Sequence, residues 1–98
     1  MKMDNKIDIR GLDLAMLFGP ADSHLRIIED SFEVKTVIRN DTIKISGDKI
    51  KIALAKEIIH EMKQTLGRKG SINLKDVKQL IEIISVDNGQ NNDNVIKD

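Results

Sequence analysis

The period of the apolar and polar positions changes several times along the chain, and each change predicts a different element. Residues 6–10 alternate polar and apolar side chains, which is typical of a short half-buried strand. Residues 14–18 are apolar almost throughout and predict a short buried helix with Asp13 as its cap. Residues 1–5 and 87–98 have little to bury, so we expect a flexible N-terminus and a linker or disordered tail.

A turn and a second helix are predicted next. Gly19 is expected to end the first helix, because Pro20 disfavours helical geometry at the residue before it. Asp22 is a favourable N-cap for a helix over about residues 23–31. The apolar positions that share one side of this helix are Leu25, Ile28 and Phe32.

Two strands joined by a tight turn follow. The first spans residues 34–39, the turn lies at Asn40-Asp41, and the return strand spans residues 42–46 and ends at Gly47. Alternation buries the isoleucines of the return strand. The residues expected on the outer face of this hairpin are Lys35, Val37, Arg39 and Lys44.

Two further helices complete the chain. Asp48 is expected to cap a long helix over about residues 49–66, with Gly67 as its stop. Asn73 is expected to cap a last helix over residues 74–85. The order is therefore β-α-α-β-β-α with an additional C-terminal helix, an α+β fold in which helices cover one face of a three-stranded sheet. The expected domain spans residues 6–70, and the additional helix lies within residues 71–86.

Composition excludes several classes of function. The formal net charge is zero, so the chain lacks the broad positive field of many nucleic-acid-binding domains. Two Phe, no Trp and no Tyr leave almost no aromatic surface on which bases could stack. The absence of Cys excludes disulfides and thiolate chemistry and fits a cytoplasmic location. No apolar run approaches the length of a membrane span, and the N-terminus does not resemble a signal peptide, so we expect no membrane partner.

The pattern resembles a KH domain, most closely where Thr42-Ile43-Lys44-Ile45-Ser46-Gly47-Asp48 runs into residues 50–59. More narrowly, it is similar to the N-terminal domain of PhoH-like proteins. The segments that carry this resemblance are Leu17-Phe18-Gly19-Pro20-Ala21-Asp22, residues 25–29, 34–40 and 43–47, and Asn73-Leu74-Lys75-Asp76-Val77. Together they fall within residues 6–86.

The resemblance implies a KH-like module of a larger cytoplasmic protein associated with RNA metabolism and phosphate starvation. In PhoH-like proteins a P-loop ATPase domain, which binds ATP and Mg²⁺, follows this module. The chain departs from the family there, because it contains no Gly-x-x-x-x-Gly-Lys-Ser/Thr sequence to hold a nucleotide. We therefore expect no cofactor in this chain, and we expect it to end in the linker before the ATPase domain.

The turn between the first two helices is the first candidate site for RNA. RNA-binding KH domains use Gly-x-x-Gly here, and loop amides at a helix N-terminus hold phosphate. Gly19 matches the first Gly, but Asp22 replaces the second and would repel phosphate, and Pro20 removes an amide donor. The alternative is a rigid turn. The residues assigned to RNA contact here are Gly19, Pro20, Ala21 and His24.

Cations on the outer face of the hairpin form the second candidate site for RNA. Lys35, Arg39 and Lys44 would contact backbone phosphates, which adds salt dependence rather than sequence readout. The alternative is a solvated strand face, because zero net charge gives no supporting field.

The long helix carries a third candidate site, for docking a partner. Lys49, Lys56 and Lys63 recur every seven residues, and His60 lies on the same polar side. No acidic residue lies four positions from any of these lysines. An ordinary solvated helix face is the alternative.

No catalytic or metal-binding constellation stands out in the sequence. His24 and His60 lie on different predicted helices, and a metal site needs three or four converging ligands. We therefore expect an accessory module without enzymatic activity, which contributes weak single-stranded RNA binding or docks to the ATPase domain. The alternative is a KH-like protein-interaction or oligomerisation domain, including a homo-oligomer, that does not bind RNA.

Overall fold

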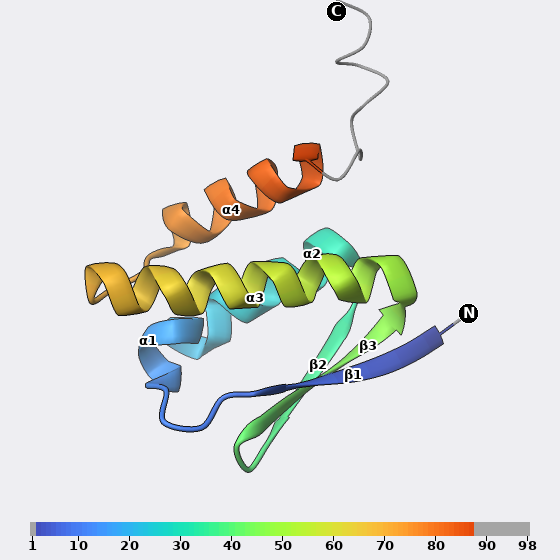
Figure 1. Cartoon of the computed structure of the whole chain (residues 1–98), viewed down its shortest axis with the longest axis horizontal. Helices are drawn as coiled ribbons and strands as arrows, with labels where there is room; N and C mark the ends of the chain where they lie inside the picture. Colours follow the sequence, from blue (N-terminus) through green and yellow to red (C-terminus); the bar gives the residue numbers. More distant parts are fainter. Residues whose placement is uncertain (1, 88–98) are drawn as a thin grey trace, which may run out of the picture.

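The computed structural model describes the backbone of residues 2–87 and the side chains of residues 5–85. Strand β1 (Lys2–Asp8) lies beside β3 (Thr42–Asp48), and β3 lies beside β2 (Lys35–Arg39), in one antiparallel sheet. The helices cover one face of this sheet and leave the other open (Figure 1). The α+β, KH-like layout with an additional C-terminal helix is confirmed.

Strand β1 begins at Lys2, well before the strand that the sequence predicts. The expectation of a flexible segment over residues 1–5 is therefore wrong for residues 2–5. These residues pair with the end of β3, so that Met3 lies opposite Gly47 and Asn5 opposite Ile45. Backbone pairing of this kind has no signature in the hydrophobic pattern, because it does not depend on burying a side chain.

The first two predicted helices are confirmed, and a short 3-10 helix that the sequence did not predict lies in the turn between them. Helix α1 (Leu14–Phe18) is capped by Asp13, whose Oδ1 accepts a hydrogen bond from Met16 N at 3.2 Å. A short 3-10 turn, η1 (Pro20–Asp22), leads into α2 (Ser23–Phe32). The buried side chains of α2 are His24, Leu25, Ile28 and Phe32.

Helix α3 (Lys49–Lys69) is longer than the sequence predicts. The prediction that Gly67 ends the helix is wrong, because Gly70 takes the left-handed conformation of a C-cap with φ 80°. Asp48 occupies the N-cap position, but among the described residues its carboxylate makes no capping hydrogen bond, so the predicted side-chain cap is also wrong.

Helix α4 (Leu74–Asp87) begins with a reciprocal pair of hydrogen bonds. Asp76 N donates to Asn73 Oδ1 at 2.9 Å, and Asn73 N donates to Asp76 Oδ2 at 3.1 Å. The latter bond, helped by Lys69, holds the pKa of the Asp76 carboxyl below its usual value. The predicted cap at Asn73 is confirmed. The tail predicted from residue 87 onward lies outside the described residues except for Asp87, which belongs to α4.

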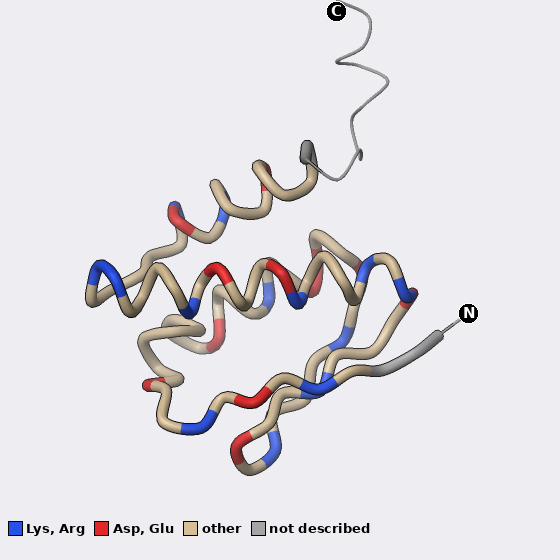
Figure 2. The backbone as a smooth tube through the Cα atoms, in the orientation of Figure 1, with Lys and Arg blue, Asp and Glu red and all other residues tan. Residues whose placement is uncertain are grey.

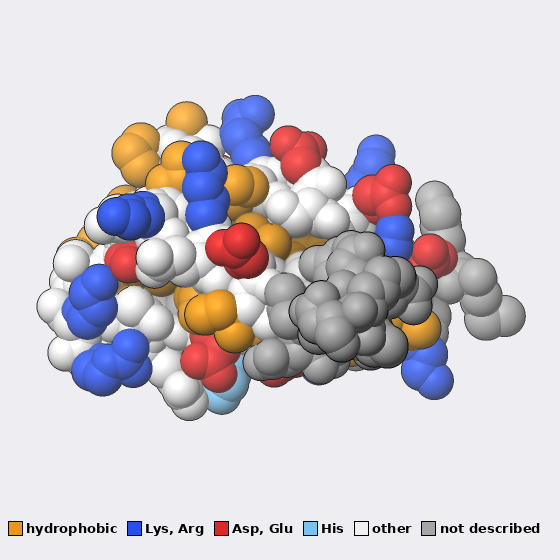
Figure 3. Space-filling view, turned by 90° about the horizontal axis from the view of Figure 1, so that it is seen from above, with side chains coloured by type: hydrophobic (Ala, Val, Ile, Leu, Met, Phe, Trp, Pro, Cys, Tyr) orange, Lys and Arg blue, Asp and Glu red, His pale blue; other side chains and the backbone are white. Residues whose placement is uncertain are grey.

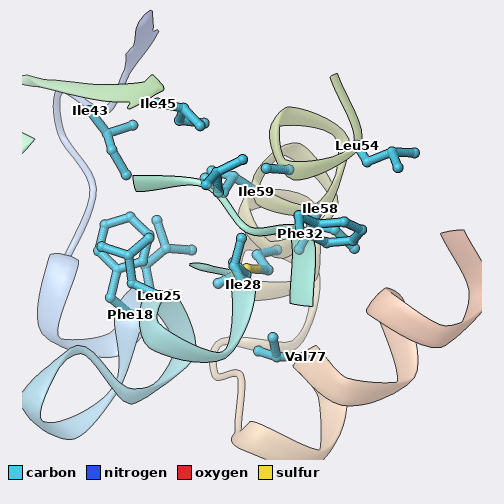
Figure 4. Packing of buried hydrophobic residues seen from close by; sticks show 14 of the residues in the cluster. Phe18, Leu25, Ile28, Phe32, Ile43, Ile45, Leu54, Ile58, Ile59 and Val77 are labelled. Carbon is cyan, nitrogen blue, oxygen red and sulfur yellow. The ribbon is translucent and has the colours of Figure 1, made fainter. Parts of the chain in front are cut away.

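The core lies between the sheet and the helical layer, and α4 extends it by packing on α2 and α3. Ile43 and Ile45 project from β3 toward Phe18, Ile28 and the aliphatic side chains of α3 (Figure 4). Val77 closes the same cluster from α4 and is fully buried. Because one face of the sheet is used for this core, the opposite face is left to carry polar and charged side chains.

Candidate functional site

The open face of the sheet carries the cations that the sequence places on the hairpin. Lys35 and Arg39 alternate with half-buried residues along β2, and Lys44 is exposed on β3. Lys and Arg positions recur on all three strands (Figure 2). The pairing register adds Lys6 of β1, which lies opposite Lys44, while Lys44 lies opposite Val37 on its other side. The prediction that these hairpin cations share an outer face is confirmed.

These strands form a hollow of about 510 Å³ on the open face. Val37 lies within it and is 49% exposed. Among the described lining residues there is no carboxylate. The residues that line the hollow are Lys6, Val37, Arg39, Asn40, Thr42 and Lys44.

Acidic side chains lie next to this hollow, at the end of β1. Asp8 accepts hydrogen bonds from the Arg10 side chain, with Arg10 Nη2 at 2.9 Å from Asp8 Oδ2. This pairing holds the pKa of the Asp8 carboxyl below its usual value. Asp8 therefore stays ionised, but Arg10 compensates its charge within the same surface. The cations that line the hollow itself are Lys6, Arg39 and Lys44.

The turn after α1 has an unusual backbone. Gly19 has φ 78°, and the two residues Ala21 and Asp22 both adopt left-handed conformations with φ 51° and 57°. The prediction that Asp22 caps α2 is wrong, since its carboxylate makes no capping hydrogen bond among the described residues. An N-cap side chain reaches the first amides of a helix from an extended backbone, and Asp22 is not extended. Arg26 Nε instead donates to Ala21 O at 3.0 Å and ties the turn to α2.

His24 points into the molecule rather than toward a ligand. Its side chain is 3% exposed, and its Nδ1 lies 2.9 Å from Leu17 O, so Nδ1 carries the proton and donates. Gly19 is also buried, and a Cβ built on it would lie 2.8 Å from His24 Nε2. The assignment of Gly19 and His24 as direct RNA contacts is therefore corrected: both residues hold the turn in shape from within. Pro20 and Ala21 remain exposed.

A groove between α2 and β2, which the sequence did not reveal, separates this turn from the open face of the sheet. The groove has a volume of about 480 Å³. Glu29 Oε2 accepts hydrogen bonds from Thr36 N and Thr36 Oγ1, both at 2.8 Å, and so occupies the outward amide of the edge strand. Asp22 adds a second carboxylate to the lining. Arg26 also lines the groove, but two carboxylates against one guanidinium leave it a poor place for phosphate.

Two lysines of the third candidate site, which lies on α3, make contacts within the fold. Lys56 Nζ lies 3.2 Å from Asn5 Oδ1, and Lys63 Nζ lies 3.4 Å from Asp8 O, so both lysines hold β1 against the helix. His60 is exposed and interacts with Gln64 four residues later on the same helix, at 3.2 Å. Lys49 is exposed at the start of α3.

The structure thus divides the predicted RNA-contact residues between two surfaces. Pro20 and Ala21 lie on the helical side, whereas Lys35, Arg39 and Lys44 lie on the open face of the sheet. Lys6 was missed, although the alternation over residues 6–9 is a signal that could have placed it on an exposed face. The cross-strand register that brings it to Lys44 cannot be found from local alternation.

No protein-family model matches the chain, and no curated protein or solved structure is significantly similar to it. Within the described residues, no three His, Asp or Glu side chains are grouped so that they could hold a metal ion. None of the helices in the described part of the chain is both long enough and apolar enough to cross a bilayer.

Proposed function

We propose that the chain is the KH-like N-terminal module of a PhoH-like ATPase and that it contacts the backbone of single-stranded RNA through the open face of its sheet. The observation that carries the proposal is the hollow in which Lys6, Arg39 and Lys44 converge around Val37. Such a surface offers phosphate a set of positive groups on a rigid support.

The chemistry of this surface determines the kind of contact. Cations on a strand face neutralise phosphates and release counterions, which gives affinity that falls steeply with salt. Without aromatic side chains on the face, no base can be held by stacking. We therefore expect weak binding with little sequence preference. ATP hydrolysis belongs, in this proposal, to the domain that follows and not to the residues of this chain.

A titration with a short single-stranded RNA at low salt tests the contact surface. The amides of Lys6 and of residues 35–44 are expected to shift, and the affinity is expected to fall as salt is raised. Arg39→Glu should weaken binding by about threefold to tenfold, because it replaces an attractive charge in the hollow by a repulsive one.

Lys78→Glu is the matched control, since it makes the same change of charge on an exposed position of α4, which packs on α2 and α3. It should leave the affinity nearly unchanged. Shifts confined to residues 19–24 would move the site to the turn after α1. Equal losses in both variants would mean that only net charge matters and would sink the proposed site.

The parentage has its own test. A reading frame that continues from this segment into a Gly-x-x-x-x-Gly-Lys-Ser/Thr sequence would support a PhoH-like ATPase, and a frame that continues into an unrelated domain would reject it.

Docking to the ATPase domain is a second candidate function, and exposed apolar side chains on the helical side favour it. Ile50 beside Lys49 is 71% exposed, and Ile83 on α4 is 55% exposed. Hydrophobic side chains lie between lysines and arginines on this side of the molecule (Figure 3). If the chain shows no RNA-induced amide shifts but binds the separately produced ATPase domain, docking replaces RNA contact as the proposed function.

A further inference from the structure

A second hollow adjoins the cationic hollow, where β1 ends beside the turn between β2 and β3. Its volume is about 530 Å³, and its lining shares Lys6, Asn40 and Thr42 with the first hollow. The side chains that it adds include those of Asp8, Arg10 and Asp41. Because the two hollows have three lining residues in common, a ligand that fills the first can extend directly into the second.

The two hollows differ in charge. Among the described residues, the lining of the first contains three cations and no carboxylate, whereas Asp8 and Asp41 line the second. Asp8 is paired with Arg10, whose Nη2 lies 2.9 Å from Asp8 Oδ2. The Asp41 carboxylate makes no hydrogen bond or ion pair within the described part of the chain. The Asp41 carbonyl accepts from Ile9 N at 2.8 Å, which fixes this turn residue beside β1. Asp41 therefore keeps its carboxylate oxygens for a ligand.

This difference determines which part of an RNA strand each hollow accepts. A phosphate is attracted by the cations of the first hollow and repelled by the carboxylates of the second. A ribose hydroxyl, in contrast, donates a hydrogen bond to a carboxylate, which is an acceptor only. Carboxylates recognise ribose in this way in dinucleotide-binding sites. The 3′ end of RNA offers two neighbouring hydroxyls and no further phosphate, so it fits the boundary between the hollows.

We propose that the second hollow holds the 3′-terminal ribose of an RNA strand, whose 2′- and 3′-hydroxyls donate to the Asp41 carboxylate, while the preceding phosphates lie in the first hollow. This inference rests on the proposed RNA contact and adds a direction to it. The 3′ end lies at the hairpin turn, and the rest of the strand leads away from the turn. Asn40 and Thr42, which line both hollows, surround the terminal sugar without adding charge.

A phosphate added to the 3′ end distinguishes this arrangement from simple collection of charge. On a surface that only neutralises phosphates, one more phosphate strengthens binding. Beside Asp41, the same phosphate replaces a hydrogen-bond donor by a negative charge and weakens binding. Because the two effects have opposite signs, a preference for the free 3′ end points to a carboxylate at that end and not to net charge.

Titration of the isotope-labelled chain with uridine tetranucleotides at low salt measures this preference. The RNA with a free 2′,3′-diol should bind about threefold to tenfold more tightly than the same RNA with a 3′-phosphate. It should bind about threefold more tightly than an RNA whose last sugar lacks the 2′-hydroxyl. The amide of Asp41 should shift with the first RNA. A 5′-phosphate should not weaken binding, because that end lies away from the second hollow.

Asp41→Asn should abolish or reverse the preference for the free 3′ end, since the amide keeps the size of the side chain and loses its charge. Asn is favourable in tight turns, so the hairpin is expected to keep its conformation. Asp30→Asn is the matched control, because it makes the same change at an exposed position of α2, on the helical side. It should leave the preference unchanged. The amide spectrum of each variant checks that the chain is folded.

The outcomes separate this inference from the proposed function. If Arg39→Glu weakens binding but the free and 3′-phosphorylated RNAs bind equally, the RNA contact stands and the position of the 3′ end is wrong. A penalty from a 5′-phosphate instead would reverse the direction of the strand and also reject it. If adenosine 5′-monophosphate displaces the RNA at an equal concentration, the two hollows hold a free nucleotide, which carries the same diol and phosphate. Absence of binding by every RNA would overturn both proposals.

Discussion

His24 and Gly19 show how single residues shape the turn after α1. The buried imidazole donates to Leu17 O at the end of α1, and the Cα of Gly19 lies against its other edge. Two successive residues, Ala21 and Asp22, then take left-handed conformations that cost each of them about 1 kcal/mol. Such a turn persists only because the side chains around it fix it. Its residues therefore act first as a rigid connection between two helices.

Gly19→Ala should destabilise the chain by about 2 kcal/mol or more, because φ is positive there and the new Cβ would meet His24 and Ser23 at 2.8 Å. Gly11→Ala is the control, since Gly11 has φ 76° but no atom lies within 4 Å of the added Cβ. Urea unfolding of both variants separates the effect of backbone conformation from the effect of the clash. Equal losses of unfolding free energy in the two variants would show that His24 moves aside for the new Cβ, and that the imidazole does not fix the turn.

At the scale of the element, α3 shows that a glycine has opposite effects within a helix and at its end. Gly67 lies inside α3, where its helix propensity is lower than that of Ala and most other residues. Gly70 ends the helix in the left-handed conformation. The amide of Gly70 donates to Leu66 O at 2.8 Å, which satisfies one of the last carbonyls.

Gly67→Ala should stabilise the chain by about 0.5–1 kcal/mol, since the added Cβ meets no atom within 4 Å and helix propensity improves. Gly70→Ala should destabilise it by about 1 kcal/mol, because Ala disfavours a φ of 80°. Thermal unfolding of the two variants measures the sign of each change in stability. Destabilisation by Gly67→Ala together with little effect of Gly70→Ala would mean that α3 ends at Gly67 in solution, as the sequence alone suggests.

Local periodicity was sufficient to predict most elements and the outer face of the hairpin. The alternation in β2 and β3 placed Arg39 and Lys44 outward, and the buried isoleucines opposite them inward, because a strand has only two faces. Asn73 was predictable as a cap, because its contact with Asp76 lies within three residues.

Contacts between parts of the chain that are distant in sequence could not be predicted from the pattern of apolar and polar residues. The position of Lys6 beside Lys44 depends on the pairing of β1 with β3, and residues 2–5 extend that strand without an apolar pattern. The hydrogen bonds from Thr36 to Glu29 join two elements, and nothing in either segment indicates them. The cap at Asp22 failed for the same reason, since the packing of the preceding turn fixes its backbone.

At the scale of the molecule, the two sides of the sheet differ in the residues that they carry. The helical side is occupied by one core, in which Val77 of α4 joins Ile58, Ile28 and the other buried residues of α2 and α3. The open side carries the cationic hollow, and the β1 edge lies between the two sides. A ligand bound on the open face, as we propose, would therefore leave the core undisturbed, provided that α4 is a permanent part of that core.

Val77→Ala tests whether α4 belongs to the same cooperative unit as the sheet. Val77 is fully buried, so the truncation should cost about 1–3 kcal/mol of the free energy of unfolding. If α4 unfolds only together with the rest, amide exchange should accelerate at Ile43 and Ile45 as much as within α4. Ile83→Ala, at a side chain that is 55% exposed, should change neither quantity appreciably. Acceleration confined to α4 would instead identify it as a separately opening helix, which a neighbouring domain could displace while the open face of the sheet keeps its shape.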